Sequence, residues 1–171
     1  MSVRGKGKMK LNLPKIGLRN IKTALAVTVC MVIFNIFGRE NAFYACIAAV
    51  ICMKDTVSSS FAMGKNRLIG TVLGAILGII VIFIMVKLPF LYDYNSFITG
   101  LGIVIAIYAC NVLNKPGSVT IACIVFIGIM INYSGPQSYA YAVSRSIDTA
   151  IGIIVTILIN KYFNPPKEKD E

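Results

Sequence analysis

The sequence lacks histidine altogether, and charged residues make up only 14% of its 171 positions. Without histidine it offers no imidazole for a metal site, for general base catalysis or for a proton switch near neutral pH. Soluble domains carry about 25% charged residues. With 57% hydrophobic residues, this chain has too little polar surface to cover a soluble fold. We therefore predict an all-α, polytopic membrane protein.

Motifs for catalysis and cofactor binding are also missing. The chain has no P-loop, no H-E-x-x-H motif and no glycine-rich dinucleotide turn. A serine nucleophile would have no histidine base. The cysteines form no C-x-x-C pair and lie in apolar runs, where thiols are typical packing residues: Cys30, Cys46, Cys52, Cys110 and Cys123. The sequence therefore predicts neither an enzyme nor a cofactor or metal site.

A glycine-rich segment occurs twice. Arg67 opens an apolar run with glycine at every fourth position, and a similar run follows Arg145, 78 residues later. Residues 45–47 (ACI) also match residues 122–124 at an offset of 77. The alternative is chance similarity between apolar segments, but the nearly constant offset favours two related halves. Small residues on one helix face are predicted to pack helices together: Gly70, Gly74, Gly78 and Gly152.

Hydrophobic runs predict six transmembrane helices. They cover about residues 21–37, 42–53, 68–86, 97–113, 119–133 and 140–159. The second run is short and leads into polar residues, so it is either an ordinary span with a cytoplasmic loop or a span that unwinds at its inner end. Three spans in each half would insert the second half upside down, giving two inverted three-helix repeats. The predicted parts are an N-terminal tail (1–18), a membrane domain (19–163, with halves at about 19–88 and 96–163) and a C-terminal tail (164–171).

Lysine and arginine are unevenly distributed along the chain. With the N-terminus inside, 14 cations lie on the cytoplasmic side of the six spans and 3 on the outside. The positive-inside rule then predicts a multi-pass protein of the cell membrane with both termini cytoplasmic. Seven cations fall within the first 22 residues: Arg4, Lys6, Lys8, Lys10, Lys15, Arg19 and Lys22. Beside a hydrophobic span, such a cluster indicates attraction to anionic lipid headgroups rather than to nucleic acid.

Charged residues inside or beside the predicted spans are the candidate pathway residues. Arg145 and Asp148 lie three apart, so they share a helix face and can pair. A carboxylate in hydrocarbon costs about 2.5–3.5 kcal/mol and normally faces protein or water. Arg145 could therefore attract an anion, with Asp148 holding the arginine or relaying a proton. The alternative is an interfacial arginine with a local partner.

Other charged residues can likewise be interpreted as pathway residues or as membrane anchors. Arg67 is the repeat counterpart of Arg145 and is expected at the cytoplasmic mouth of the third span, as a pathway residue or as an anchor. Lys54 and Asp55 form a polar pair near the inner membrane face. Lys22 is interpreted as an anchor, with the lining of an inner vestibule as the alternative.

Several stretches carry a resemblance to a known family. They are residues 19–26 (RNIKTALA), residues 43–50 (FYACIAAV), the R-L-I-G-T-x-x-G motif from Arg67, and the R-x-x-D-T-x-x-G motif from Arg145 with the later Asn160. Together they resemble the aromatic acid exporter family, within the wider fusaric acid resistance group of bacterial membrane proteins. The resemblance implies a six-span module that moves organic anions outward and acts as a homodimer. By match to the motifs, it points to Arg67, Arg145 and Asp148 as pathway residues.

The chain departs from many such relatives, which continue into a soluble cytoplasmic domain or a second membrane half. It ends at Glu171, so we expect a second copy to complete the pathway. We therefore predict a transporter or channel-like exporter of organic anions. The alternative is a non-transporting membrane scaffold, or a subunit of a larger membrane complex, whose cations contact only headgroups.

Overall fold

Turn-forming residues divide the chain into helices that are joined by short loops. The computed structural model describes residues 17–39, 41–131 and 137–163, and everything regular within them is helical. The α-helices are α1 (Leu18–Ile36), α2 (Phe43–Cys52), α3 (Val57–Lys87), α4 (Asn95–Val112), α5 (Val119–Ile131) and α6 (Gln137–Tyr162). Two 3₁₀ helices that begin with proline, η1 (Pro89–Tyr94) and η2 (Pro116–Ser118), lead into α4 and α5, because proline suits the first helical position.

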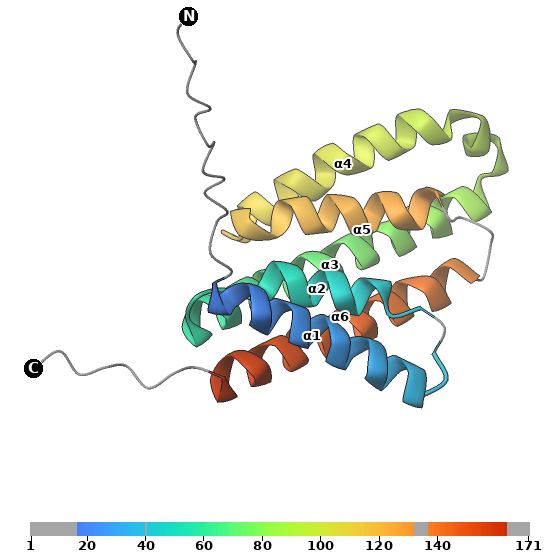
Figure 1. The fold of residues 1–171 in the computed structure, drawn as a ribbon. Helices are drawn as coiled ribbons and strands as arrows, with labels where there is room; N and C mark the ends of the chain where they lie inside the picture. Colours follow the sequence, from blue (N-terminus) through green and yellow to red (C-terminus); the bar gives the residue numbers. More distant parts are fainter. Residues whose placement is uncertain (1–16, 40, 132–136, 164–171) are drawn as a thin grey trace, which may run out of the picture.

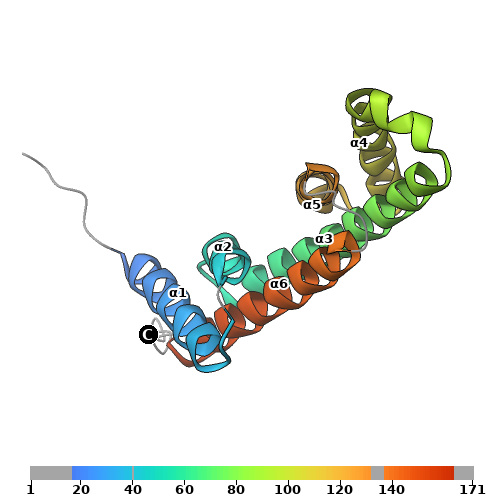
Figure 2. The same ribbon diagram turned by 90° about the vertical axis from the view of Figure 1, so that its right-hand side faces the viewer.

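The two longest helices form the centre of the molecule. Figure 2 shows α3 and α6 side by side, with α1 at one edge of the array and α4 at the other. Helix α2 packs on α6, and α5 packs on α3. Figure 1 shows that consecutive helices run in opposite directions, so α1 begins and α6 ends at the same end of the molecule.

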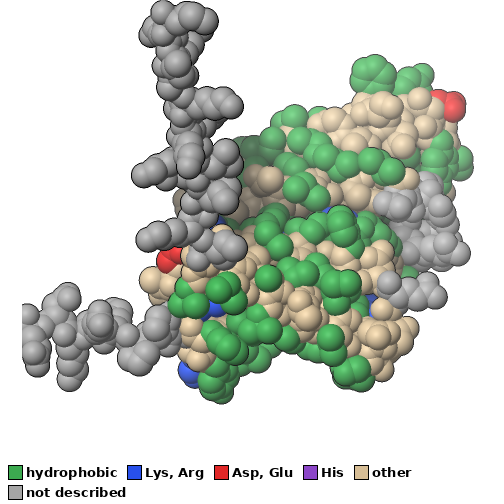
Figure 3. All heavy atoms as spheres, viewed as in Figure 1, with side chains coloured by type: hydrophobic (Ala, Val, Ile, Leu, Met, Phe, Trp, Pro, Cys, Tyr) green, Lys and Arg blue, Asp and Glu red, His purple; other side chains and the backbone are tan. Residues whose placement is uncertain are grey.

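Length and composition make four helical segments able to cross a membrane. They are Leu18–Ile36, Val57–Lys87, Pro89–Val112 and Ala140–Tyr162. The apolar segments that contain α2 and α5, Phe43–Cys52 and Pro116–Ile131, are shorter. The visible surface carries many hydrophobic and few charged side chains (Figure 3), as expected for a protein in contact with lipid. The chain is therefore a helical membrane protein.

The start of α3 differs from the sequence-based boundary. We expected the third span to begin at about residue 68, but α3 begins at Val57, where the Thr56 side chain accepts a hydrogen bond from the Ser59 amide. Such a cap satisfies a backbone donor that the helix leaves unpaired. Arg67 consequently lies about 15 Å along the helix, and it is buried with 6% exposure. Charged side chains suggested a span boundary in the sequence, whereas the folded helix continues through them.

Glycine and alanine allow the closest helix contacts. A Cβ atom added to Gly74 of α3 would collide with the carbonyl oxygen of Ala122 in α5. A Cβ atom added to Gly152 of α6 would collide in the same way with the carbonyl oxygen of Ala45 in α2. Gly70 and Gly78 also face α5 or its leading turn, at Ser118 and Ile129 respectively. These four glycines therefore hold α5 against α3 and α2 against α6.

Candidate functional site

The main candidate site is a polar pocket at the end of the molecule where α1 joins α2. Its cavity has a volume of about 490 Å³. The lining side chains come from the α1–α2 connection, the first turn of α2 and the first half of α6: Arg39, Asn41, Tyr44, Tyr141, Ser144, Arg145 and Asp148. This pocket joins segments about 100 residues apart in the sequence.

Two tyrosines position Arg145. Its guanidinium carbon lies 3.9 Å from the centre of the Tyr44 ring, and its Nη1 donates a hydrogen bond to the Tyr141 hydroxyl. The two tyrosine hydroxyls are themselves 2.8 Å apart. Helical side chains point back toward the N-terminus of their helix, which explains why Arg145 reaches the residue four positions earlier. The cation therefore rests on an aromatic face, where the ring quadrupole attracts it.

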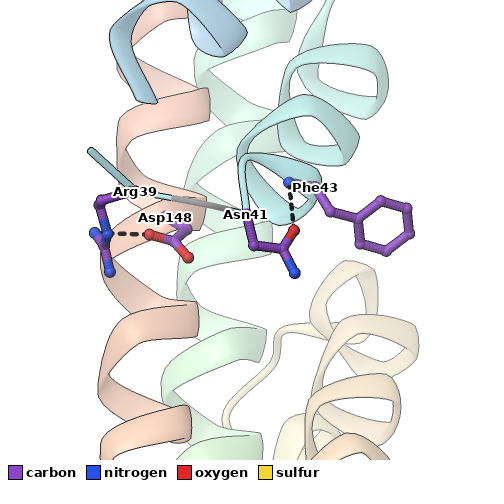
Figure 4. Close-up of polar contacts among 4 residues, drawn as sticks. All are labelled: Arg39, Asn41, Phe43 and Asp148. Carbon is purple, nitrogen blue, oxygen red and sulfur yellow. Dashed lines mark hydrogen bonds and ion pairs between the residues drawn. The ribbon is translucent and has the colours of Figure 1, made fainter. Parts of the chain in front are cut away.

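Asp148 has a different partner from the one expected. We expected it to pair with Arg145, but its Oδ1 lies 2.8 Å from Nη1 of Arg39 (Figure 4). Asp148 lies C-terminal to Arg145, whereas the arginine side chain runs toward the N-terminus of α6. Asn41 supports the same corner, because its Oδ1 accepts a hydrogen bond from the amide of Phe43 at the start of α2. The ion pair therefore ties the α1–α2 connection to α6.

The charges in this pocket leave a positive balance. Arg39 and Asp148 neutralise each other, and within the described residues no carboxylate lies within ion-pair distance of Arg145. A partly buried arginine without an acid is suited to hold a carboxylate or another planar anion. Sequence reasoning missed Arg39 and the two tyrosines. The available signals were a cation in the first short connection and a tyrosine four residues before Arg145.

Arg67 and Arg145 occupy separate positions. Arg67 is buried in α3, and its Nε and Nη1 atoms have no hydrogen-bond partner among the described residues. Met63, one turn before Arg67, packs against the buried cluster that contains Cys52 at the end of α2. Arg145 lines the pocket and Arg67 does not.

Lys54 and Asp55 lie at the opposite end of α2 from the pocket. There the Asn160 amide nitrogen donates to the carbonyl oxygen of Lys54 at 3.0 Å and to the Ser60 hydroxyl at 2.9 Å. Lys22 donates to Asn160 Oδ1 at 3.1 Å and is only 5% exposed. The anchor interpretation of Lys22 is therefore wrong, because an anchoring side chain extends to the headgroups. Asn160 instead links α1, α6 and the α2–α3 connection.

Metal ligands do not gather anywhere in the part of the chain that the structure describes. In these residues no three side chains of the types Cys, Asp and Glu converge. The side chains that line the pocket, Arg145 on two tyrosines beside the Arg39–Asp148 ion pair, can bind and orient an anion.

Known proteins resemble most of this chain. A UPF0421 protein of Staphylococcus saprophyticus is 28% identical over 156 residues, covering 91% of this chain and 45% of the relative. A UPF0421 protein of Halalkalibacterium halodurans is 29% identical over 154 residues, covering 90% of this chain and 41% of the relative. The UPF0421 protein YgaE of Bacillus subtilis is 24% identical over 153 residues, covering 90% of this chain and 41% of the relative. The chain thus spans less than half the length of these relatives, and no solved structure matches it.

A family profile covers nearly the whole chain. The profile described as aromatic acid exporter family member 1 matches residues 14–163, which include every described helix and all the pocket residues. This match confirms the resemblance seen in the arginine and glycine motifs. The chain belongs to the aromatic acid exporter family.

Proposed function

We propose that this protein moves organic anions, aromatic carboxylates among them, outward across the cell membrane. The observation that carries the proposal is Arg145, a cation that lies on a tyrosine ring in a cavity of about 490 Å³. Among the described residues no carboxylate pairs with it, since Asp148 pairs with Arg39. A carboxylate can form charge-assisted hydrogen bonds to the guanidinium. An aromatic ring on the same anion can pack edge to face against a tyrosine.

The membrane arrangement in this proposal has six crossings in two inverted halves. The alternating direction of the helices supports six crossings (Figure 1). The contact of Gly74 with Ala122 and that of Gly152 with Ala45 support the two halves, because each pair joins the third helix of one half to the second helix of the other. Helices as short as α2 would cross only where the protein or a polar cavity covers their ends.

The remaining pathway residues extend the route toward the cytoplasm. Arg67 would carry the anion through the core, and Lys54 with Asp55 would line the inner mouth. Both termini would lie in the cytoplasm, with the basic N-terminal tail on anionic lipid headgroups. A homodimer would supply a second module, and cross-linking in native membranes would reveal it as a species of twice the mass.

The test is anion flux from proteoliposomes loaded with 4-hydroxybenzoate at a set membrane potential. We expect wild type to release the anion and Arg145→Gln to release it at least about tenfold more slowly, since one charge-assisted contact contributes about 1.5–3 kcal/mol. Lys87→Gln is the matched control, because it removes one charge from an exposed position at the same end of the molecule.

The opposite result favours a scaffold. If folded wild type releases none of a panel of organic anions, or if Arg145→Gln releases them as fast as wild type, the pocket is not part of an anion route. A membrane scaffold or complex subunit would then be the better description of the chain.

A further inference from the structure

Arg67 and Arg145 occupy equivalent positions in the predicted repeat but have different neighbours. The residue four positions before Arg145 is Tyr141, whose hydroxyl accepts its hydrogen bond. The residue four positions before Arg67 is Met63. Its thioether is at best a weak acceptor. The repeat offset of 77 residues places Ile121 where the first half has Tyr44, so Arg67 also lacks the aromatic face.

The first half also has no acid at the position that corresponds to Asp148. Asp148 lies three residues after Arg145, and the residue three after Arg67 is Gly70. Gly70 cannot be replaced by an acid in this fold, because even a Cβ atom there would lie 2.5 Å from the carbonyl oxygen of Ser118. Close packing of α3 on η2 therefore excludes an internal carboxylate at this position.

The consequence is a buried cation with unpaired donors. Arg67 is only 6% exposed, and neither Nε nor Nη1 has an acceptor among the residues that the structure describes. A buried donor without a partner costs far more than a solvated one, and for a cation the cost is larger still. An anion bound at Arg67 would offset this cost.

We propose that Arg67 is the centre of a second anion site, between α2 and α3, that binds carboxylates by charge without recognising an aromatic ring. This inference rests on the proposed function and extends it, since the pocket at Arg145 would select the ring and the site at Arg67 would not. Arg67 is occluded in this structure, so the anion enters when the α2–α3 end of the molecule opens. The polar cluster around Asn160 lies at that end, where it ties α6 to the α2–α3 connection and to α3.

The test is equilibrium binding, measured as the shift in melting temperature of the full chain in neutral-lipid nanodiscs. The probes are benzoate and cyclohexanecarboxylate, which have similar size but differ in aromaticity. A ligand that binds only the folded state raises the melting temperature, and at equal concentration the tighter ligand raises it more. In Arg145→Gln, where the Arg67 site remains, we expect the two probes to bind equally well. Adding Arg67→Gln should then weaken both by at least about tenfold.

Two further variants keep the outcome decisive. Lys65→Gln is the matched control, since it removes an exposed charge two residues away and should leave binding unchanged. Met63→Tyr gives Arg67 the hydroxyl partner that Arg145 has, so we expect weaker binding of both probes without loss of charge. This variant also tests the site if Arg67→Gln does not fold.

The unliganded protein supplies a second readout. Arg67→Gln should melt at a higher temperature than wild type in anion-free buffer, because it removes an unpaired buried charge. A lower melting temperature together with unchanged binding of both probes would overturn the site and make Arg67 a structural residue. Flux through the Arg145 pocket could persist in that case, so the two proposals fail separately.

Discussion

Identical side chains can take different roles because of the residue one helical turn earlier. Arg145 has a tyrosine hydroxyl and an aromatic ring within reach. Arg67 has a methionine at the same spacing, and two of its buried donors have no partner in the described parts of the chain. At the residue scale, the environment of each arginine therefore depends on the residue four positions earlier in its helix and on the helix packed against it.

The Arg39–Asp148 ion pair is the first residue-scale prediction. Asp148 is buried and Arg39 is about one-third exposed, at 36% of its side chain. Solvent screening at the exposed partner limits the strength of the pair. We expect Asp148→Asn to lower the free energy of unfolding by about 1–3 kcal/mol. Unfolding in mixed micelles would measure it.

A double-mutant cycle provides the control for that prediction. If the pair is the cause, Arg39→Gln should have little further effect in the Asp148→Asn background. Fully additive effects would show that the two side chains act independently and would contradict the pairing.

Asn160 carries the second residue-scale prediction. Its side chain is fully buried and makes three hydrogen bonds, to Lys22, Ser60 and the backbone of Lys54. Replacing it by alanine removes the partner of the partly buried carbonyl group of Lys54. We expect Asn160→Ala to destabilise the protein by about 2–4 kcal/mol. Asn35→Ala, on the exposed face of α1, should change stability by no more than about 0.5 kcal/mol. Equal effects of the two substitutions would argue against the cluster.

At the scale of elements, small residues decide which helices meet. Helix α3 can approach α5 only where glycine replaces a side chain, and α6 approaches α2 in the same way. In a membrane, lipid is as apolar as a leucine side chain, so close packing and not the exclusion of water drives such contacts. The glycine positions therefore set the order of the helices in the array.

Gly74→Ala tests this packing. The added Cβ atom would meet a backbone carbonyl, which cannot rotate away as a side chain can. We expect a loss of about 1–3 kcal/mol and a weakened contact between α3 and α5. Gly100→Ala is the matched control, because a Cβ atom there meets nothing within 4 Å. Alanine favours helix by about 1 kcal/mol over glycine, so this control should be neutral or stabilising.

A cross-link would report the same change structurally. A disulfide or bifunctional reagent between engineered cysteines on the facing sides of α3 and α5 should form less readily in Gly74→Ala than in Gly100→Ala. Equal cross-linking and equal stability would mean that the two helices adjust without cost.

At the scale of the whole molecule, alternating helix direction gives the protein two distinct ends. The connections after α2 and α4 lie at the end where α1 begins, and the α1–α2 and α3–α4 connections lie at the other (Figure 1). The cations concentrate at the first of these ends in the sequence-based topology. Orientation in the membrane should therefore be uniform.

Labelling of substituted cysteines would test the orientation. An impermeant maleimide added to intact cells should label Lys87→Cys, at the end of α3, and should label Lys161→Cys, near the end of α6, only after permeabilisation. Both positions are exposed in the structure. Wild type is the background control, since its five cysteines are buried or half-buried. The reverse pattern would overturn the predicted topology.

Composition and motifs determined the class of this protein. A chain with 57% hydrophobic and 14% charged residues has no stable fold in water, and helices satisfy their own backbone hydrogen bonds in lipid. Residues 19–26, residues 43–50 and the motifs that begin at Arg67 and Arg145 were together sufficient to suggest the family. These properties are local, because hydrophobicity and motif spacing do not depend on which helices become neighbours.

The tertiary structure alone decided the partners of the buried polar groups. It paired Asp148 with Arg39 instead of Arg145, and it placed Lys22 on Asn160. It also carried α3 eleven residues upstream of the predicted boundary, which put Arg67 in the core. Each of these outcomes depends on contacts between segments far apart in the chain. A one-dimensional pattern of hydrophobicity contains no information about such contacts.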